Sequence, residues 1–532
     1  MVDFYSLGFL VFLIISLICY YTIFKKQQWA VALVTSIVFY LYIGKKNLIV
    51  LCFSALVIYI CSVLMNKVSI NGKNAEKTLK AQEDYQALST PEKKSRLQEL
   101  RKNTLNKKRV LLYLPLVIIL GILCYTKYWS VLFNSGLGIV LPIGISFYTF
   151  MAIAYIVDIY NEKYQPPKSF LKFFLFISWF PHLIQGPIDR YDSLAEQFEK
   201  QHILSKKVLK TALFLLLLGF LKKYAIGDLL FDLISKILDY PVNETPGSLL
   251  AFGILLYSAQ QYADFSGGID IVSGISLLYG ISLAPNFRQP YFSTSLGDFW
   301  RRWHISLGAF MRDYVFYPLA LTKPMMELGK KAGKKYGKHL GRVLPACIAN
   351  IVVFILVGVW HGPQMHYLIW GLYNGIIIAL SDLLAPLFNK LSDVLHINRE
   401  TKGFKTFQII RTFIIVNIGW YFDRIEDIRV AFNALWITIS KFKPGMFIYS
   451  LMNTINNNSA GPLYTYGSLL IAFISILIVF VISVVREKQM DIIEIMDSKP
   501  MLKVISVTSV LFLILFSFVF VQNAGGFLYA NF

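Results

Sequence analysis

Apolar stretches separated by short polar segments follow one another along most of the chain. A helix needs roughly 20 predominantly apolar residues to cross a bilayer, and many of these stretches approach that length. They lie at about 7–24, 28–43, 47–66, 110–127, 138–159, 168–186, 206–226, 247–263, 345–361, 364–388, 408–422, 464–485 and 502–521. The pattern predicts an all-α polytopic membrane protein with about eleven transmembrane helices. The remaining stretches are expected to be re-entrant or to lie flat at the interface.

Polar residues and helix breakers fall in mid-run at Leu141–Phe147, Phe180–Tyr191 and Gln260–Asp270. Irregular backbone is tolerated at membrane depth only where protein buries it or where it lines a watered cavity. These stretches therefore predict interrupted helices around an internal chamber or tunnel. Ser266 in the last stretch lacks the Gly-x-Ser-x-Gly elbow of a serine nucleophile, so a helix break is the preferred interpretation there.

Composition supports the membrane class, because 56% of the 532 residues are hydrophobic, against about 45–50% apolar residues in soluble chains. The net charge of +21 would be compatible with nucleic-acid binding. However, the basic residues sit in short segments between apolar stretches rather than on one soluble face, so no nucleic acid is expected.

No internal repeat of the kind seen in many transporters is evident. The chain is interpreted as a single membrane domain over residues 1–532.

Two basic segments predict the orientation of the chain. Residues 67–109 hold twelve Lys/Arg against five Asp/Glu, and residues 321–342 hold seven against one. Because short cytoplasmic loops are enriched in Lys and Arg, both segments are expected on the cytoplasmic side. The first is a hydrophilic insertion whose composition favours a surface helix or a helical hairpin broken near Pro91. The second is either a solvated face or a surface for the phosphates of a nucleotide-bearing donor or for an acidic carrier protein.

The cysteines lie in or beside apolar stretches and lack the spacing of a CxxC or Cys/His metal site. They are Cys19, Cys52, Cys61, Cys124 and Cys347. Neither a disulfide framework nor a metal site is predicted, and these residues are interpreted as small core side chains.

The segment Asp298–Tyr317 reads DFWRRWHISLGAFMRDYVFY and places arginines, tryptophans and a histidine together in a lipid-soluble chain. On a continuous helix, Trp300, His304 and Leu307 share one face and the arginines take other directions. One interpretation is an interfacial helix with its arginines at lipid phosphates and its tryptophans in an aromatic belt. Lipid attraction needs no imidazole, so His304 is a candidate functional residue.

A second histidine, His361, lies in the segment GVWHG at Gly358–Gly362. It is expected near the end of one span, at the turn before the next, because Gly362 and Pro363 follow it. Imidazole can remove a proton from an attacking hydroxyl and return it later, since its pKa lies near neutrality. A structural histidine is the alternative. Two histidines without a Cys/His/carboxylate cluster favour acid/base chemistry over metal binding.

Several motifs together resemble the membrane-bound O-acyltransferase family. They are GPIDRY at Gly186, the run Gln260–Tyr317 with DFSGGID, NFRQPY and FWRRWHISLGAFMRDY, and GVWHG and WGLYNG between Gly358 and Gly375. The resemblance covers about residues 141–427 as a catalytic core. WYFDRIEDIRVAFNAL at Trp420 and the closing GFLYANF at Gly526 are more similar to the alginate O-acetyltransferase branch. GPIDRY and NFRQPY also fit the branch that transfers D-alanine to teichoic acid.

The resemblance implies a ring of tilted helices around a central tunnel, embedded in membrane lipid as a multi-pass protein of the bacterial cytoplasmic (inner) membrane. It implies His361 as the catalytic histidine with His304 close by. Asn374 stands where the family usually has a further histidine. The family usually takes an acyl group from a cytoplasmic thioester, acetyl-CoA or an acyl carrier protein, and delivers it to an acceptor outside. These donors are substrates, so no resident cofactor is implied.

The resulting hypothesis is transfer of an acyl group, most simply acetyl from acetyl-CoA, to a cell-envelope or secreted polysaccharide. The transfer is direct or passes through an extracytoplasmic acyltransferase or accessory protein. His361 is expected to act as general base, and His304 to position the thioester or to stabilise charge developing on its carbonyl oxygen. The expected substrate-binding residues are Gln261, Asp264, Trp300, Arg301, Trp303 and Trp360.

Three alternatives remain at this stage. The first is D-alanyl transfer to teichoic acid from a carrier protein. The second is a transporter or flippase without acyl chemistry, whose buried histidines and Asp264 would form a proton relay or ligand site. The third is a scaffold that recruits an extracytoplasmic esterase-like partner.

Overall fold

The computed structural model describes all residues except 1–5, 133–141, 143, 240–241, 458–460 and 522–532, and the regular structure of the described part is all helical. Leu141 of the first interrupted stretch and the closing motif GFLYANF therefore lie outside the described residues. The chain divides into two compact units. One contains Met1–Ile184, Ile188–Leu204 and Tyr279–Leu283, and the other contains Gln185–Pro187, Ser205–Leu278 and Ala284–Phe532.

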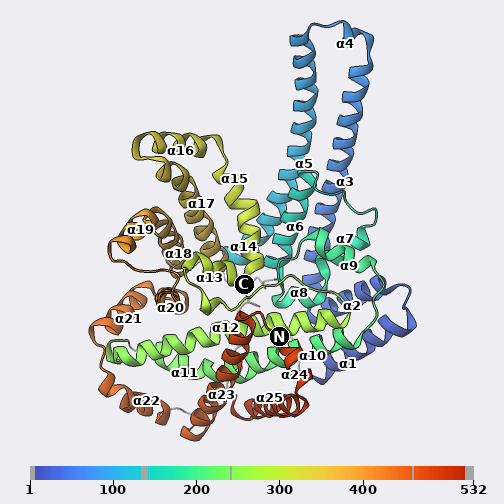
Figure 1. Cartoon of the computed structure of the whole chain (residues 1–532). Helices are drawn as coiled ribbons and strands as arrows, with labels where there is room; N and C mark the ends of the chain where they lie inside the picture. Colours follow the sequence, from blue (N-terminus) through green and yellow to red (C-terminus); the bar gives the residue numbers. More distant parts are fainter. Residues whose placement is uncertain (1–5, 133–141, 143, 240–241, 458–460, 522–532) are drawn as a thin grey trace. The chain divides into compact units, whose positions relative to one another are not determined.

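The α-helices are labelled in Figure 1, and the short 3₁₀- and π-helices are named η in chain order. Those of the first unit are α1 (Leu7–Ile18), η1 (Cys19–Ile23), α2 (Gln28–Ile43), α3 (Lys45–Ala81), α4 (Glu83–Ala87), α5 (Thr90–Leu132), α6 (Ile145–Tyr160), α7 (Phe170–Ser178), α8 (Phe180–Gln185) and α9 (Tyr191–Glu199). Those of the second unit begin with α10 (Lys206–Lys222), η2 (Lys223–Asp228), α11 (Leu229–Leu238), η3 (Val242–Glu244), α12 (Gly247–Leu278), η4 (Pro290–Phe292), α13 (Leu296–Arg302), α14 (Ile305–Met311), η5 (Arg312–Phe316), α15 (Tyr317–Ala320) and α16 (Lys323–Tyr336). They continue with α17 (Lys338–His361), α18 (Met365–Leu383), α19 (Ala385–Val394), α20 (Lys402–Arg424), α21 (Ile428–Ser440), η6 (Pro444–Met446), α22 (Phe447–Asn456), α23 (Pro462–Glu487), α24 (Ile492–Ser498) and α25 (Pro500–Phe520).

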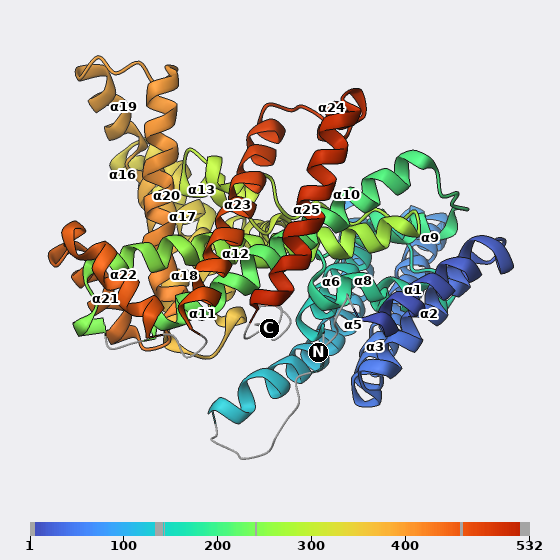
Figure 2. The same cartoon turned by 90° about the horizontal axis from the view of Figure 1, so that it is seen from below.

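Among the described residues, five helices are long and apolar enough to cross a membrane, and the bent pair of α18 and α19 would be a sixth. The five are α3, α5, α17, α23 and α25; Figure 2 shows the last two side by side. Other predicted stretches form apolar helices of 10–17 residues, at Leu7–Ile23, Gln28–Ile43, Ile145–Tyr160, Phe170–His182 and Ile428–Ser440. The multi-pass membrane protein is confirmed, whereas the count of about eleven spans is not, because apolar character alone does not fix helix length.

The basic segment 67–109 belongs to a helical hairpin in the first unit, formed by α3 and α5 with α4 at its tip (Figure 1). Pro91 is the second residue of α5, where the N–H that proline lacks would have no helical partner. The two helices approach closely where a Cβ on Gly72 would lie 2.6 Å from the Thr104 methyl. Across the hairpin, Arg101 donates to both carboxylate oxygens of Glu76 at 2.6 and 3.0 Å.

Glu162 ties the hairpin to the turn after α6. Its carboxylate accepts hydrogen bonds from Lys73 at 2.6 Å, from Lys108 at 2.8 Å and from the Ser69 hydroxyl. The bonds from Lys108 and Lys73 lower the pKa of Glu162 from an ordinary 4.5 to about 2. The carboxylate therefore stays ionised in the folded protein even in moderately acidic solution.

The interrupted helix predicted at Gln260–Asp270 is wrong, because α12 runs through this stretch without a break and buries most of its residues. Glycine is accepted inside this helix because it permits close packing against α10. A Cβ on Gly267 would lie 3.0 Å from the carbonyl oxygen of Gly219. The interruption predicted within Phe180–Tyr191 is confirmed, since α8 ends and α9 begins there with non-helical residues between them.

A π-helix, η2, joins α10 to α11 and gathers charged groups in the core of the second unit. The Lys223 ammonium pairs with Asp228 at 2.9 Å and with Asp264 of α12. The neighbouring Lys222 pairs with Asp270 at 2.7 Å. Buried charge is costly unless it is paired, so these contacts favour one arrangement of α10 and η2 against α12.

Candidate functional site

The sequence pattern suggested one continuous helix around His304. The structure has a break there instead. α13 ends at Arg302, and the chain then pairs with an extended segment that precedes η4. The backbone N–H of Arg288 donates to the carbonyl of Arg302 at 2.9 Å, and the N–H of Ile305 donates to the carbonyl of Asn286 at 3.0 Å. These tertiary hydrogen bonds replace helical ones, so the predicted common face of Trp300, His304 and Leu307 does not form.

His304 lies at the break and begins α14. Its backbone has φ 48° and ψ 52°, in the left-handed region that non-glycine residues rarely adopt. Its side chain is 3% exposed, and its ring packs edge-on against Phe265 of α12 with centroids 4.8 Å apart. Burial lowers the pKa of His304, which lies outside the candidate spans, from 6.5 to about 3. The imidazole is therefore neutral at pH 7 and keeps a lone pair that can accept a hydrogen bond.

His361 is the last residue of α17, which confirms its predicted place at the end of a span. α17 and α18 meet at glycines: a Cβ on Gly358 would lie 2.4 Å from the carbonyl oxygen of Tyr367, and one on Gly371 would lie 2.3 Å from that of Phe354. This close approach brings the ring of His361 to 4.8 Å from the ring of Trp370, measured between centroids. The sequence motifs GVWHG and WGLYNG thus form one packed helix pair that carries the histidine.

Trp360 connects the two histidines. Its ring centroid lies 5.1 Å from that of His361 and 6.1 Å from that of His304. The two histidines, 57 positions apart in sequence (361 − 304), therefore contact the same indole ring. The resemblance implied that the two histidines lie close together; both adjoin Trp360, and their roles stay predictions.

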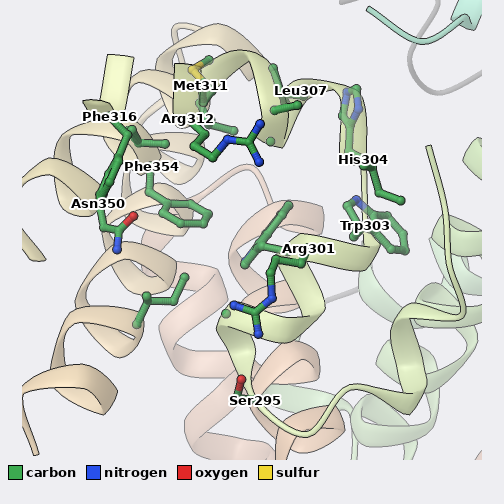
Figure 3. Close-up of a pocket in the computed structure, with 18 of the residues that line it drawn as sticks. Ser295, Arg301, Trp303, His304, Leu307, Met311, Arg312, Phe316, Asn350 and Phe354 are labelled. Carbon is green, nitrogen blue, oxygen red and sulfur yellow. The ribbon is translucent and has the colours of Figure 1, made fainter. Parts of the chain in front are cut away.

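A cavity of about 560 Å³ lies beside His304 in the second unit (Figure 3). Its wall is mainly apolar, with Leu307, Met311 and Phe354 among its residues. Figure 3 shows Arg301 and Arg312 reaching toward the open space, with His304 and Trp303 on one side and Asn350 and Phe354 on another. The cavity thus combines apolar surface, two guanidinium groups and an imidazole.

The predicted substrate-binding residues divide into two groups. Trp300, Arg301 and Trp303 line this cavity together with His304. Trp300 donates from its indole nitrogen to the side-chain oxygen of Asn374 at 3.0 Å, so Asn374 holds the indole of a residue that lines the cavity. Trp303 is 1% exposed and stacks on Phe299. Trp303 therefore also serves as core.

Gln261, Asp264, Trp360 and His361 are not among the residues that line this cavity. Gln261 donates to Asp423 at 3.0 Å, and Asp264 is ion-paired with Lys223. Both polar side chains are held by other protein groups in the core, which is a structural role. Their assignment to substrate binding stays a prediction.

The sequence did not show which side chains hold His304 and Gln261 in place. Asn286 accepts a hydrogen bond from the backbone N–H of Ser306 at 3.0 Å and lies 3.2 Å from Nδ1 of His304. Asp423 is buried and accepts from Tyr257 at 2.7 Å and from Gln261. Both residues occur in the motifs NFRQPY and WYFDR that were noted, but their partners lie far away in sequence. Among the described residues, no group of three or more His, Cys, Asp or Glu is arranged to hold a metal ion.

Comparison with known proteins agrees with the motifs. Residues 161–334 match the family profile described as MBOAT, membrane-bound O-acyltransferase family. The chain is 35% identical over 295 residues to a probable alginate O-acetylase of Pseudomonas syringae, covering 55% of this chain and 51% of the relative. It is 30% identical over 367 residues to the peptidoglycan O-acetyltransferase of Helicobacter pylori, covering 62% and 64%. It is 31% identical over 285 residues to the teichoic acid D-alanyltransferase of Bacillus subtilis, covering 52% and 67%.

The chain spans about half the length of the alginate O-acetylases that it matches. The match to the D-alanyltransferase covers two thirds of that relative, and the profile match contains the NFRQPY and FWRRWH motifs around His304. The chain belongs to the membrane-bound O-acyltransferase family.

Proposed function

We propose that this protein is an O-acyltransferase that moves an acyl group, most simply acetyl from acetyl-CoA, from a cytoplasmic thioester to a hydroxyl of a cell-envelope or secreted polysaccharide. The transfer is direct or uses an extracytoplasmic partner protein. The single observation that carries the proposal is the contact of His304 and His361 with one indole ring, Trp360, beside a cavity that His304 lines. The alginate and peptidoglycan O-acetyltransferases among the relatives support acetyl transfer to polysaccharide.

In the proposed reaction the acceptor hydroxyl oxygen attacks the thioester carbonyl carbon. His361 takes the hydroxyl proton as general base, which is worth about 10²–10⁴-fold in rate for a well-placed base. The carbon–sulfur bond then breaks, and the proton passes from His361 to the leaving sulfur. The products are an O-acyl ester and a free thiol, so no oxidant, metal or further reactant is required.

The cavity suits the arm of a thioester donor. Its volume of about 560 Å³ is in the usual range for small-molecule sites. Its apolar wall would exclude water from the thioester, which protects the ester bond from hydrolysis. Arg301 is exposed over 70% of its side chain and makes a 3.6 Å ion pair with Asp298, so it remains accessible to a phosphate group. A guanidinium can hold phosphate oxygens in a bidentate pair.

A second candidate is D-alanyl transfer from a carrier protein to teichoic acid. The specific observation in its favour is the two-thirds coverage of the Bacillus subtilis teichoic acid D-alanyltransferase. The same cavity and the same histidines would serve this reaction, because both donors are thioesters and both acceptors are hydroxyls. The two candidates differ only in donor and acceptor identity.

Acyl transfer by purified protein in liposomes tests the proposal. Radiolabelled acetyl-CoA is supplied outside the liposomes, alginate oligosaccharide is enclosed in their lumen as the acceptor probe, and thiol release and labelled product are measured. We expect turnover by wild type, loss of at least about 100-fold in His361→Ala, and normal turnover in the matched control His396→Asn, whose histidine is exposed. Normal transfer by folded His361→Ala would overturn the base assignment. Turnover only with D-alanyl carrier protein would favour the second candidate, and substrate movement without any acyl product would favour a transporter.

A further inference from the structure

We propose that Asn286 is a positioning residue that holds the imidazole of His304 as the Nδ1–H tautomer, so that Nε2 is the nitrogen that accepts a hydrogen bond during acyl transfer. The catalytic part of this inference rests on the proposed function. The tautomer itself does not, because it follows from contacts within the protein.

The first step is the orientation of the Asn286 amide. Its side-chain oxygen accepts from the backbone N–H of Ser306 at 3.0 Å and from the Ser306 hydroxyl at 2.9 Å. A backbone N–H can only donate, so the atom that faces it must be the amide oxygen and not the NH₂ group. The NH₂ group has no hydrogen-bond partner among the residues that the structure describes. The amide is thus oriented by what its oxygen accepts.

The second step is the protonation of His304. Its Nδ1 lies 3.2 Å from the same Asn286 oxygen. An amide oxygen cannot donate, so this contact is a hydrogen bond only if Nδ1 carries the proton. A neutral imidazole has one N–H. With the proton on Nδ1, Nε2 carries the lone pair.

The third step is the rigidity of the arrangement. Asn286 also accepts from the N–H of Ile305 with its backbone carbonyl at 3.0 Å, and the next residue, Phe287, pairs with Trp303. His304 is therefore held from both sides in its left-handed backbone conformation. Strained backbone persists where surrounding contacts over-determine it, and it clusters at functional sites.

The consequence changes the role expected for His304. An Nε2 lone pair cannot donate to the thioester carbonyl oxygen, so stabilisation of an oxyanion by neutral His304 is disfavoured. The same lone pair can accept from a neighbouring hydroxyl of the sugar acceptor and so orient the attacking oxygen, whose own proton His361 takes. Asn286 would act through His304 and would not touch the substrate.

A purely structural alternative is that Asn286 only caps the start of α14 through Ser306. Two variants separate the roles. Asn286→Leu removes the acceptor at similar size, and Asn286→Asp keeps an oxygen that can accept from both Ser306 and His304. The matched control is Asn417→Leu, because Asn417 in α20 accepts from the Ser258 hydroxyl at 2.7 Å and not from a histidine.

The decisive measurement is ¹⁵N NMR of the full chain in lipid nanodiscs at pH 7.5 with labelled histidine, with the His304 signals assigned by their loss in His304→Ala. We expect Nδ1–H in wild type, Asn286→Asp and Asn417→Leu, and a shift toward Nε2–H in Asn286→Leu. Asn286→Leu should also lower kcat for acetyl-CoA about 10- to 100-fold, part of the usual acid/base contribution, with KM changed less than about threefold.

The proposal is overturned if wild-type His304 carries its proton on Nε2, or if Asn286→Leu leaves the tautomer unchanged. An unchanged kcat in Asn286→Leu together with a shifted tautomer overturns the catalytic part alone. If the tautomers behave as expected but wild type shows no acyl transfer with any thioester, the proposed function fails while the assignment of Asn286 stands.

Discussion

The α3–α5 hairpin and the α10–α12 pair both carry ion pairs, but in opposite surroundings. In the hairpin, Glu76 pairs with Arg101 and Lys80, whose side chains are 61% and 52% exposed. In the second unit, Lys223 pairs with Asp228 and Asp264, and none of the three side chains is more than 4% exposed. Water and salt screen the first set. The second set has no such compensation if one partner is lost.

The same comparison explains why hydropathy identifies some helices and not others. α12 is long enough to span a membrane, yet it is absent from the apolar candidates because it carries Gln260, Gln261 and Asp264. Other helices surround these polar groups and satisfy them. A helix in contact with lipid must be apolar, whereas a helix enclosed by protein needs only partners for its polar atoms.

The largest effect is expected for Lys223→Met. This change leaves Asp228 and Asp264 buried without their cation, and breaking a buried pair in this way costs about 3–5 kcal/mol. The loss of stability is measured by thermal unfolding in detergent, with size-exclusion chromatography used to monitor the folded fraction. The triple variant that adds Asp228→Asn and Asp264→Asn should recover much of the loss. A single variant as stable as wild type would contradict the structural role of this cluster.

A smaller effect is expected where α10 and α12 touch. In Gly219→Ala the new Cβ would lie 2.8 Å from the carbonyl oxygen of Gly267 and 2.7 Å from the Ile271 side chain, and such overpacking costs about 1–3 kcal/mol. The control is Gly121→Ala in α5, where a Cβ meets nothing within 4 Å and alanine favours the helix by up to about 1 kcal/mol. In the same assay, the unfolding midpoint should be lower than that of wild type for Gly219→Ala and not for Gly121→Ala. Equal midpoints would show that the contact relaxes freely.

Glu162→Gln should cost about 0.5–1 kcal/mol, discounted because the glutamate is 39% exposed and screened by water. The folded pKa of about 2 is below the ordinary 4.5, so the unfolded chain binds more protons in that range. The stabilisation is therefore complete above pH 4.5 and is lost as pH falls toward 2. Hydrogen exchange of the hairpin measured from pH 6 to pH 3 should show this loss in wild type and a flatter profile in Glu162→Gln. The same profile in both proteins would contradict the assignment.

The smallest effect is expected for Glu76→Gln. Its partners are solvent-exposed lysine and arginine side chains, so the unfolding midpoint should not move measurably and should not depend on salt. A large destabilisation would mean that the hairpin is buried against a partner in the assay. That outcome would remove the contrast between the two regions.

Some of this protein could be predicted from local sequence alone. Apolar runs predicted a helical multi-pass membrane protein, since burial of apolar side chains needs no knowledge of their neighbours. The breaker residues after His361 predicted the end of α17, and the motifs around both histidines predicted the family. Their catalytic roles stay predictions.

Tertiary contacts decided the rest. The helix break at His304, its left-handed backbone and its proposed tautomer depend on contacts with Asn286, 18 positions earlier. The continuity of α12 depends on Gly219 and on Lys223, which pairs with Asp264 at a separation of 41 positions. Hydropathy and helical periodicity depend only on residue type and local order along the chain. They therefore cannot show which distant group pairs with a buried charge or replaces a helical hydrogen bond. Only the folded chain supplies those partners, and they determine where this protein holds its histidines.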